Sequence, residues 1–393
     1  MREELLHFIW EFRYFNHREL STEAGEPLFI HRPGDRNTHQ GPDFRNARIT
    51  IGDIPREGPV ELHLRTSDWH RHGHTGDPHY RDTILHVVWE NDTTDPPAGI
   101  PILMLRDRTP KLLLSRYQHF MAGQSFVPCE GLLSAPNSAL IPWAAFRQTL
   151  ITQRLQARTR FIASLLESNS QHWELTTWWL IMRSLGQPVN TELFLTIARS
   201  LPLTMLLRHR TNLMQLEALL LGQAGLLGKP GPLEKEYRFL KNKYTLTPIQ
   251  LPLSFLRMRP AHQPNIRLKQ LAAMLHRYSG WFTPLLEADD PPGAKTNVLI
   301  NAFIPLLFAY GTLRQEPRQR EKALRWLESL PPEDNSIIRR WRQLGMTART
   351  AADTQALLEL KKNYCSGKKC LDCAIGQALL TPDPPSPASE NLP

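Results

Sequence analysis

The sequence predicts an α+β N-terminal domain, built as a mixed sheet with a leading helix, followed by an all-α domain. Residues 28–106 contain short runs of β-type residues separated by Gly, Pro and Asp. Beyond about residue 140, apolar residues recur at helical spacing almost to the end. At 393 residues, the chain is long enough for two or three separate cores.

The leading helix is expected over residues 2–15, where Leu5, Phe8, Ile9 and Phe12 recur at helical spacing. Acidic residues lie between them, and these are Glu3, Glu4 and Glu11. The segment therefore predicts an amphipathic helix with an acidic face.

Five runs within residues 28–106 are the expected strands: LFIH, ARITIG, PVELHLR, ILHVVWE and PILMLR. Alternation within VELHLR places Glu61, His63 and Arg65 on one face and three apolar residues on the other. We expect the apolar face to enter a core and the polar face to present its side chains in a row. Residues 41–106 are expected to form one sheet.

The later residues supply the helical domain and a tail. Its clearest segments are AAFRQTLITQRLQARTRFIASLLES, WELTTWWLIMRSLG, ELFLTIARSLPLTMLLRH and NLMQLEALLLGQAGLL. Residues 381–393 are rich in Pro and Ser and predict disorder. We divide the chain into a nuclease-like α/β domain (1–130), an α-helical domain that ends in a Cys-rich segment (131–380) and the tail (381–393).

Composition narrows the functional classes. No apolar run approaches a membrane span, and the acidic start does not resemble a signal peptide, so we expect a cytoplasmic protein without a membrane partner. Four cysteines in a chain of this size argue against a secreted disulfide scaffold. The sequence contains no GxxxxGK[ST], strand-linked GxGxxG or GxSxG motif, which disfavours P-loop, dinucleotide and serine-hydrolase chemistry.

Charge is divided unevenly along the chain. Residues 1–130 hold 15 Lys+Arg and 19 Asp+Glu, a net charge of −4. Residues 131–393 hold the remaining 32 Lys+Arg and 19 Asp+Glu, a net charge of +13. Basic side chains gain affinity for polyanions by releasing counterions, whereas carboxylates bind cations. The division suits a nucleic-acid partner held by the basic part, although a net charge of +9 is also ordinary for a bacterial protein.

Several segments resemble an uncharacterised bacterial family defined as a domain of unknown function (number 2851), and the resemblance runs from residue 1 to about 380. They are LLHFIW, GPDFRNARITIGD, VELHLRTSDW, DPHYRDTILHVVWEND, VPCE, RSLPLTMLLRHRTNLMQLEALLLGQAGLL, LRMRPAHQPNIRLKQLA and YCSGKKCLDCAIG. The resemblance implies no activity, so the functional predictions rest on residue chemistry.

Pro42-Asp43 and Glu61-x-His63 form the first candidate site. Their order loosely resembles the PD-(D/E)XK nuclease superfamily, in which an Asp and an (Asp/Glu)-x-Lys on neighbouring strands share one face, often with a Glu from the preceding helix. The resemblance implies that Asp43 and Glu61 hold Mg²⁺ or Mn²⁺, that Glu3 or Glu4 completes the shell, and that His63 replaces the lysine. The alternative is a turn at Asp43 and a solvated strand face at Glu61 and His63.

Six histidines lie within residues 63–86, interleaved with Asp68, Asp77 and Asp82. Neutral imidazoles bind Zn²⁺, Mn²⁺ or Fe²⁺, so His63, His74 and His86 with Glu61 form a second candidate metal site. His74 or Asp77 near Asp43 and Glu61 would merge the two sites. Exposed loop histidines without a ligand are the alternative.

The third candidate is Cys365-x4-Cys370-x2-Cys373, with Cys129 as a distant fourth ligand. Closely spaced thiolates suit Zn²⁺ or an iron–sulfur cluster. A single tetrahedral ion predicts neighbouring sulfurs within roughly 4 Å of one another, and a cluster predicts a wider spacing. Ordinary reduced cysteines are the alternative.

Together these features predict a metal-dependent nuclease or a nuclease-like nucleic-acid-binding protein. The alternatives are a non-catalytic adaptor or scaffold with a degenerate nuclease fold, and a histidine-ligated metalloenzyme that acts on a small molecule.

Overall fold

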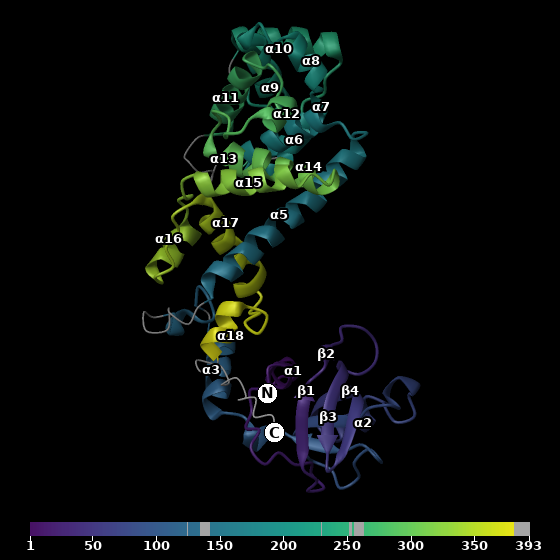
Figure 1. Cartoon of the computed structure of the whole chain (residues 1–393). Coiled ribbons are helices and arrows are strands. Elements are labelled where there is room, and N and C mark those ends of the chain that lie inside the picture. Colours follow the sequence, from purple (N-terminus) through teal and green to yellow (C-terminus); the bar gives the residue numbers. More distant parts are fainter. Residues whose placement is uncertain (124, 134–141, 229, 251–253, 255–262, 381–393) are drawn as a thin grey trace. The chain divides into compact units, whose positions relative to one another are not determined.

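The computed structural model describes residues 1–123, 125–133, 142–228, 230–250, 254 and 263–380 (Figure 1). The predicted tail at 381–393 lies outside the described residues. The chain divides into two compact units. Unit 1 comprises Met1–Phe146, Gln343–Gly345 and Leu360–Pro393, and unit 2 comprises Arg147–Arg342 and Met346–Glu359. The Cys-rich segment therefore groups with the sheet, although the sequence places it at the end of the helical domain.

Unit 1 contains the predicted mixed sheet, which has six strands among the described residues, in the order β1-β3-β4-β5-β6 with β2 also paired to β3. The strands are β1 (Leu28–Arg32), β2 (Asp35–Arg36), β3 (Phe44–Ile51), β4 (Ile54–Arg65), β5 (Leu85–Glu90) and β6 (Ile102–Met104). Strands β1, β3 and β4 pair antiparallel, whereas β4, β5 and β6 pair parallel. Each expected strand run forms a strand of this sheet.

Strand β4 is buried on both faces over Val60–His63, which contradicts the alternative of a solvated strand face at Glu61 and His63. Glu61 is 5% exposed and His63 is 1% exposed. Helix α1 (Glu3–Glu11) and helix α2 (Asp68–Arg71) both pack against this strand. Because the flanking segments cover it, the polar row of β4 lies inside unit 1.

Helix α1 is shorter than the expected segment over residues 2–15. Leu5, Phe8 and Ile9 are buried as the spacing predicts, but Phe12 caps the helix C-terminus and is 39% exposed. The Trp10 indole Nε1 donates a hydrogen bond to Pro33 O at 3.0 Å. This contact fixes α1 beside the segment that joins β1 to β2.

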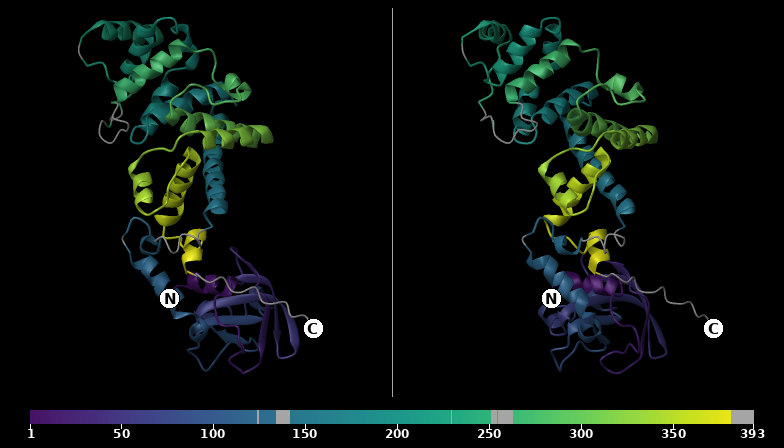
Figure 2. Two further views of the ribbon diagram at one scale, coloured as in Figure 1. Left: turned by 60° about the vertical axis from the view of Figure 1, so that its left-hand side comes forward. Right: turned by 90° about the vertical axis from the view of Figure 1, so that its left-hand side faces the viewer.

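The remaining elements of unit 1 connect and cover the sheet. They are η1 (Pro78–Tyr80), η2 (Arg106–Arg108), α3 (Lys111–Ala122), η3 (Glu130–Leu132), η5 (Leu360–Cys365) and α18 (Ala374–Leu380). Figure 2 shows α18, in yellow, beside α3, in blue. Arg116 of α3 donates a hydrogen bond to Leu379 O at 3.1 Å. The C-terminal segment thus packs on the helix that follows the sheet.

Unit 2 is helical, as predicted. Its elements are α5 (Trp143–Ser168), α6 (Trp173–Leu185), α7 (Thr191–Ser200), α8 (Leu203–Arg208), α9 (Leu213–Gln223), α10 (Pro232–Tyr244), α11 (Pro264–His276), α12 (Phe282–Glu287), α13 (Thr296–Val298), η4 (Leu299–Phe303), α14 (Ile304–Leu313), α15 (Pro317–Ser329), α16 (Ser336–Gln343) and α17 (Ala351–Glu359). The tryptophans at 178 and 341 are fully buried, as expected for core residues.

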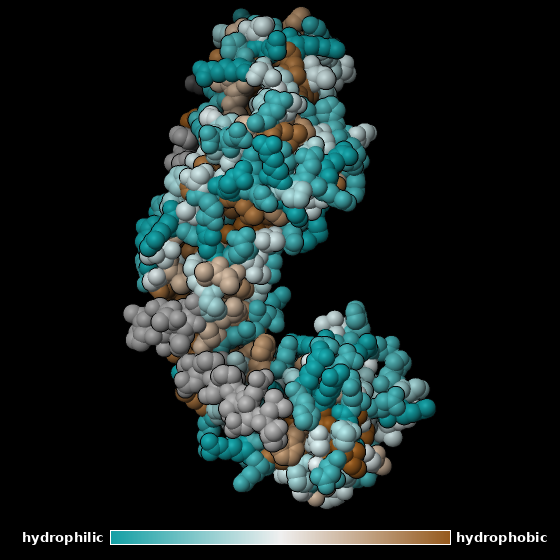
Figure 3. Space-filling view, viewed as in Figure 1, coloured by the Kyte–Doolittle hydropathy of each residue, from teal (hydrophilic) through white to brown (hydrophobic). Residues whose placement is uncertain are grey.

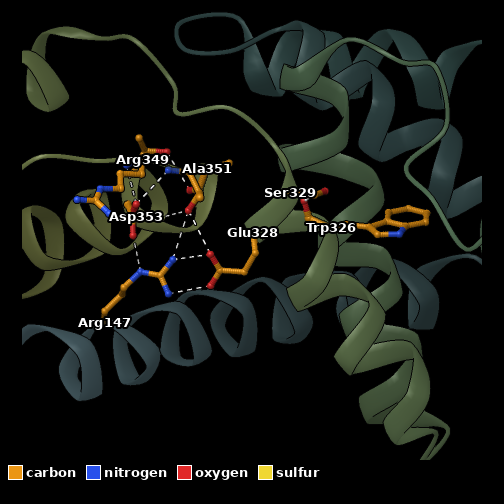
Figure 4. Close-up of polar contacts among 9 residues, drawn as sticks. Arg147, Trp326, Glu328, Ser329, Arg349, Ala351 and Asp353 are labelled. Carbon is orange, nitrogen blue, oxygen red and sulfur yellow. Dashed lines mark hydrogen bonds and ion pairs between the residues drawn. The ribbon is translucent and has the colours of Figure 1, made fainter.

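A polar network joins three helices of unit 2 (Figure 4). The Arg147 guanidinium of α5 contacts both Glu328 carboxylate oxygens of α15 at 2.6 and 2.7 Å, and it contacts the Asp353 carboxylate of α17 at 2.5 Å. Asp353 also accepts the amides of Arg349 and Thr350. One guanidinium therefore links α5, α15 and α17.

One helical stretch, Thr296–Leu313, is long and apolar enough to cross a membrane by length and composition alone. In the folded chain, 67% of this window is buried, and a core helix passes the same test. Figure 3 shows that the visible face of unit 2 is mainly hydrophilic, with apolar residues in small separate groups.

Candidate metal and active site

Asp43 and Glu61 lie together at the start of β3 and within β4. The backbone amide of Asp43 donates to Glu61 Oε2 at 3.0 Å, and the amide of Leu62 donates to Asp43 Oδ2 at 3.0 Å. These reciprocal hydrogen bonds form because β3 and β4 pair antiparallel with Phe44 opposite Val60. The two carboxyl groups that the motif singles out are therefore neighbours.

Helix α1 supplies two further side chains to this place. One candidate ligand atom each from Glu3, His7 and Asp43 all lie within 4.8 Å of one another, and we call these residues the carboxylate group. His7 Nε2 lies 3.2 Å from Asp43 Oδ2 and 4.0 Å from Glu3 Oε1. His7 Nε2 is also buried without a well-aligned hydrogen-bond partner. A buried ring nitrogen beside two carboxylates is suitable for a divalent cation.

Glu61 is the most perturbed carboxyl of the site. Burial, followed by the negative charges of Asp43 and Glu3, raises the pKa of Glu61 to about 9, against the opposing effect of the Asp43 amide. Burial and the charge of Asp43 also raise the pKa of Glu3. Without a cation, Glu61 therefore keeps its proton at neutral pH, because ionisation would place another charge in a buried acidic site. A bound cation would reverse this preference.

A second set of ligands lies against the other Glu61 oxygen. One ring nitrogen each from His63, His72 and His74 all lie within 4.8 Å of one another, and we call these residues the imidazole group. Glu61 Oε1 lies 3.4 Å from His63 Nε2 and 3.2 Å from His74 Nε2. Glu61 thus lies between the carboxylate group and the imidazole group. The two candidate sites of the sequence are adjacent.

His86 of β5 orients His63 instead of joining the imidazole group. His63 Nδ1 lies 2.9 Å from His86 Nε2, and His63 Nε2 lies 3.1 Å from His72 Nδ1. Burial and neighbouring histidines lower the pKa of His63 to about 2, and burial lowers that of His86 to about 3. Both rings are therefore neutral, and the His63–Glu61 contact is not an ion pair. Neutral rings have the free lone pair that metal binding requires.

His74 is more accessible than the His63 beside it. Its ring stacks on Tyr80 at a centroid distance of 3.8 Å, and its side chain is 10% exposed, against 1% for His63. Burial lowers the pKa of His74, despite the opposing charges of Asp43 and Asp77. A partly exposed neutral imidazole beside a carboxyl group can accept a proton from water.

The remaining acidic and histidine candidates of the sequence have local partners. Asp68 accepts the amide of Arg65 and pairs with Arg71, and Asp77 caps η1 and bonds His79. His70 bonds Thr75. Glu4 lies beside the site instead of in it, because it lines a neighbouring basic cavity.

That cavity has a volume of about 250 Å³ and lies next to α1 and β2. Its basic side chains are Arg2, Arg36, Lys368 and Lys369, and its acidic ones are Glu4 and Asp372. Arg36 Nη2 lies 3.5 Å from His7 Nδ1, so the cavity adjoins the carboxylate group.

The four cysteines are all buried, all free and all in unit 1. Cys129 precedes η3, Cys365 ends η5, and Cys373 precedes α18. They are separate from the residues of the carboxylate and imidazole groups.

A family model described as protein of unknown function DUF2851 matches residues 3–296 and 292–336. The chain belongs to the DUF2851 family. Neither the curated proteins nor the solved structures include a match to it. The DUF2851 match contains the carboxylate and imidazole groups and ends before the thiols at 365–373.

Two members of this DUF2851 site were missed by sequence reasoning, His7 and His72. His7 follows Glu3 by four residues, so both lie on one side of α1, and that spacing was a usable signal. His72 and His74 flank a positive-φ glycine, Gly73, in the loop after α2. Loop conformation of this kind cannot be read from residue spacing.

Proposed function

We propose that unit 1 is a divalent-metal-dependent nuclease. One observation carries the proposal: the carboxyl groups of Asp43 and Glu61 are joined through reciprocal backbone hydrogen bonds, with Glu3 and His7 beside them. Glu61 is buried, and Asp43 and Glu3 beside it are partly exposed, so a cation bound among them would offset the mutual repulsion of their charges. Their order along the chain, after a leading helix and before a parallel strand, also resembles the nuclease superfamily.

The ligand set favours manganese over magnesium. Magnesium prefers oxygen ligands, whereas sites that mix carboxylates with imidazoles suit softer ions. Within the carboxylate group, Asp43 and Glu3 supply oxygens and His7 supplies a nitrogen. Glu61, which accepts the Asp43 amide, supplies a further oxygen beside them. When bound, such a cation polarises a phosphodiester and lowers the pKa of an attacking water.

The chain's own residues have distinct roles in this proposal. Asp43 and Glu61 hold the cation, and Glu3 and His7 complete its shell. His63 takes the place of the motif lysine but is bonded to His86 and His72, so it positions neighbouring groups and carries no charge. His74, which is more accessible, accepts the proton from the attacking water.

Nucleic acid is the proposed substrate class because cationic side chains lie beside the carboxylate group. Arg2, Arg36, Lys368 and Lys369 line the adjoining cavity and are exposed to solvent. Lysine and arginine contacts to backbone phosphates supply sequence-independent affinity. A phosphodiester backbone held there would run close to Asp43.

The test is cleavage of labelled single- and double-stranded DNA and RNA by the full chain, with Mn²⁺, Mg²⁺ or EDTA. We expect cleavage with Mn²⁺, weaker cleavage with Mg²⁺ and none with EDTA. Asp43→Asn and Glu61→Gln should abolish it. Asp53→Asn, which removes an exposed carboxylate from the β3–β4 turn, should not.

Two outcomes would contradict the proposal. Cleavage that persists in Asp43→Asn would show that the activity does not come from this site. Nucleic-acid binding without cleavage under any metal would instead favour the adaptor with a degenerate nuclease fold.

The imidazole group favours a second candidate, a histidine-ligated metalloenzyme that acts on a small molecule. Three imidazoles with one carboxyl group suit Zn²⁺ or Fe²⁺. This candidate predicts that the purified protein contains one of these metals, that His72→Ala removes it, and that Asp43→Asn retains it. Loss of metal in both variants would instead indicate one shared centre.

A further inference from the structure

The four thiols occupy two segments that pack on each other within unit 1. Lys361 Nζ lies 5.2 Å from the centre of the Phe126 ring, and Lys368 Nζ donates a hydrogen bond to Met121 O. The Phe126 amide in turn donates to Glu130 Oε2 at 2.9 Å. These contacts bring the chain around Cys129 next to the chain around Cys365.

The segment between Cys365 and Cys373 is a tight, ordered loop. Lys368 has a positive φ of 51°, and its amide donates to Cys365 O at 3.1 Å. A Cβ added at Gly376 would lie 2.2 Å from Cys370 O, so the loop lies directly on the first turn of α18. The Cys373 sulfur accepts the amides of Ile375 and Gly376. Amide donors of this kind stabilise a sulfur that carries negative charge.

Each thiol interacts electrostatically with others of the set. Burial, and then the charges of Cys373 and Cys370, raise the pKa of Cys129 to about 12. Burial and the other three cysteines raise the pKa of Cys365. Burial and Cys373 raise the pKa of Cys370 to about 12. The four thiols are thus buried in two segments that contact each other, Cys129 in one and the other three in the second.

We propose that Cys129, Cys365, Cys370 and Cys373 ligate an iron–sulfur cluster that fastens the C-terminal segment of unit 1 to the segment after α3. Four cysteines are the usual ligand set of such clusters, and C-x4-C-x2-C is one of their spacings. The ligands are distinct from those of the proposed nuclease, so either proposal can fail without the other.

Sulfur spacing favours a cluster over a single zinc ion. One tetrahedral zinc with bonds near 2.3 Å holds its sulfurs about 3.8 Å apart. Among the described residues, the carboxylate and imidazole groups each have three candidate ligand atoms that all lie within 4.8 Å of one another. The thiols belong to neither group and form no such group of their own among these residues. Ligands placed around a multi-iron cluster are farther apart than ligands of one ion.

The test is metal and sulfide analysis of the full chain purified without oxygen. We expect iron and acid-labile sulfide in equal amounts, two or four of each per chain, and a broad visible absorption band. Cys370→Ser and Cys129→Ser should each lose most of both. Ser366→Ala, in the same loop, should retain them, because its hydroxyl contacts only Lys361.

A second measurement applies where a cysteine variant fails to fold. Wild-type protein is stripped of metal with a chelator and then treated with ferrous iron and sulfide, and the visible band should return. Stoichiometric zinc without sulfide would overturn the cluster, as would protein that neither contains iron nor takes it up. Full iron content in Cys129→Ser would overturn the four-thiolate assignment.

Discussion

Glu61 shows how one residue can belong to two sets of ligands. One of its oxygens accepts the Asp43 amide, and the other faces His63 and His74. A buried glutamate with a pKa near 9 is protonated at neutral pH in the absence of a cation. Metal binding at this residue must therefore displace a proton, and the apparent metal affinity should rise with pH.

At the same scale, His86 should act through His63. Replacing His86 with Phe removes the nitrogen 2.9 Å from His63 Nδ1, so the His63 ring loses its orientation. We expect metal affinity to fall about 10- to 100-fold, as for other groups that orient ligands. Isothermal titration with Mn²⁺ measures this change, and excess Mn²⁺ should restore activity.

His86→Gln retains a hydrogen-bonding side chain and should lose less affinity. His79→Phe is the matched control, because His79 is exposed and bonds only Asp77. Activity that excess metal fails to restore in His86→Phe would indicate disruption of the sheet instead of a positioning role.

At the scale of elements, alternation and spacing predicted the strands well but predicted their surroundings poorly. The runs around Asp43 and Glu61 formed β3 and β4, and they brought both carboxyl groups together as expected. The sequence placed Glu61 and His63 on one polar face of β4 but did not indicate that α1 and α2 pack against this strand, where both side chains are buried. Segments distant in sequence bury this face through tertiary packing. The alternation of side chains along a strand shows which residues share a face but not what covers that face.

Long-range partners also explain what the sequence missed. His7 joins the site from α1, and the segment around Cys365 packs on the segment around Cys129, more than half of the chain away in sequence. Residue types and local spacing identified the cysteine set and the histidines of residues 63–86 as candidates, but not His7. Which of these residues lie close together in the fold depends on long-range packing of the chain, which no local sequence pattern specifies.

The network that joins α5, α15 and α17 should make the stability of unit 2 sensitive to acid. Burial alone would raise the pKa of Asp353, but the Arg349 and Thr350 amides and the Arg147 guanidinium lower it overall, below the usual 3.8. A lowered pKa stabilises the folded state above pH 3.8, and this contribution is lost as the pH falls through the folded-state pKa.

Asp353→Asn should therefore reduce the free energy of unfolding by about 1–3 kcal/mol at neutral pH, and the deficit should shrink in acid. Denaturant unfolding at several pH values measures it. Asp334→Asn, which removes an exposed ion pair with Arg339, should change stability by less than about 1 kcal/mol. A deficit for Asp353→Asn that stays constant below pH 3 would contradict the linkage.

At the scale of the whole molecule, the charge division seen in the sequence persists between the folded units. Unit 1 carries 19 Lys+Arg and 22 Asp+Glu, a net charge of −3, and unit 2 carries 28 and 16, a net charge of +12. The candidate site thus belongs to a slightly acidic unit, and most of the excess positive charge belongs to the other. Nucleic-acid affinity should depend on both.

Binding to nucleic acid should consequently weaken steeply with salt. In a plot of the logarithm of affinity for duplex DNA against the logarithm of salt concentration, each phosphate contact should steepen the downward slope by about 0.9. Replacing Lys368 and Lys369 with Gln should reduce the slope by up to about 2. Fluorescence anisotropy across a salt series measures this, and binding that does not change with salt would contradict an electrostatic partner surface.

The discontinuity of unit 1 sets an order for its assembly during synthesis. The strands from Leu28 to Met104 leave the ribosome early, but Leu360–Leu380 follow only after all of unit 2 has been translated. A nascent chain can therefore form the sheet and its acidic site while Cys129 still lacks the other three thiols. Until then, the surface of α3 that α18 contacts stays uncovered, and chaperones have their longest opportunity to act on this stage.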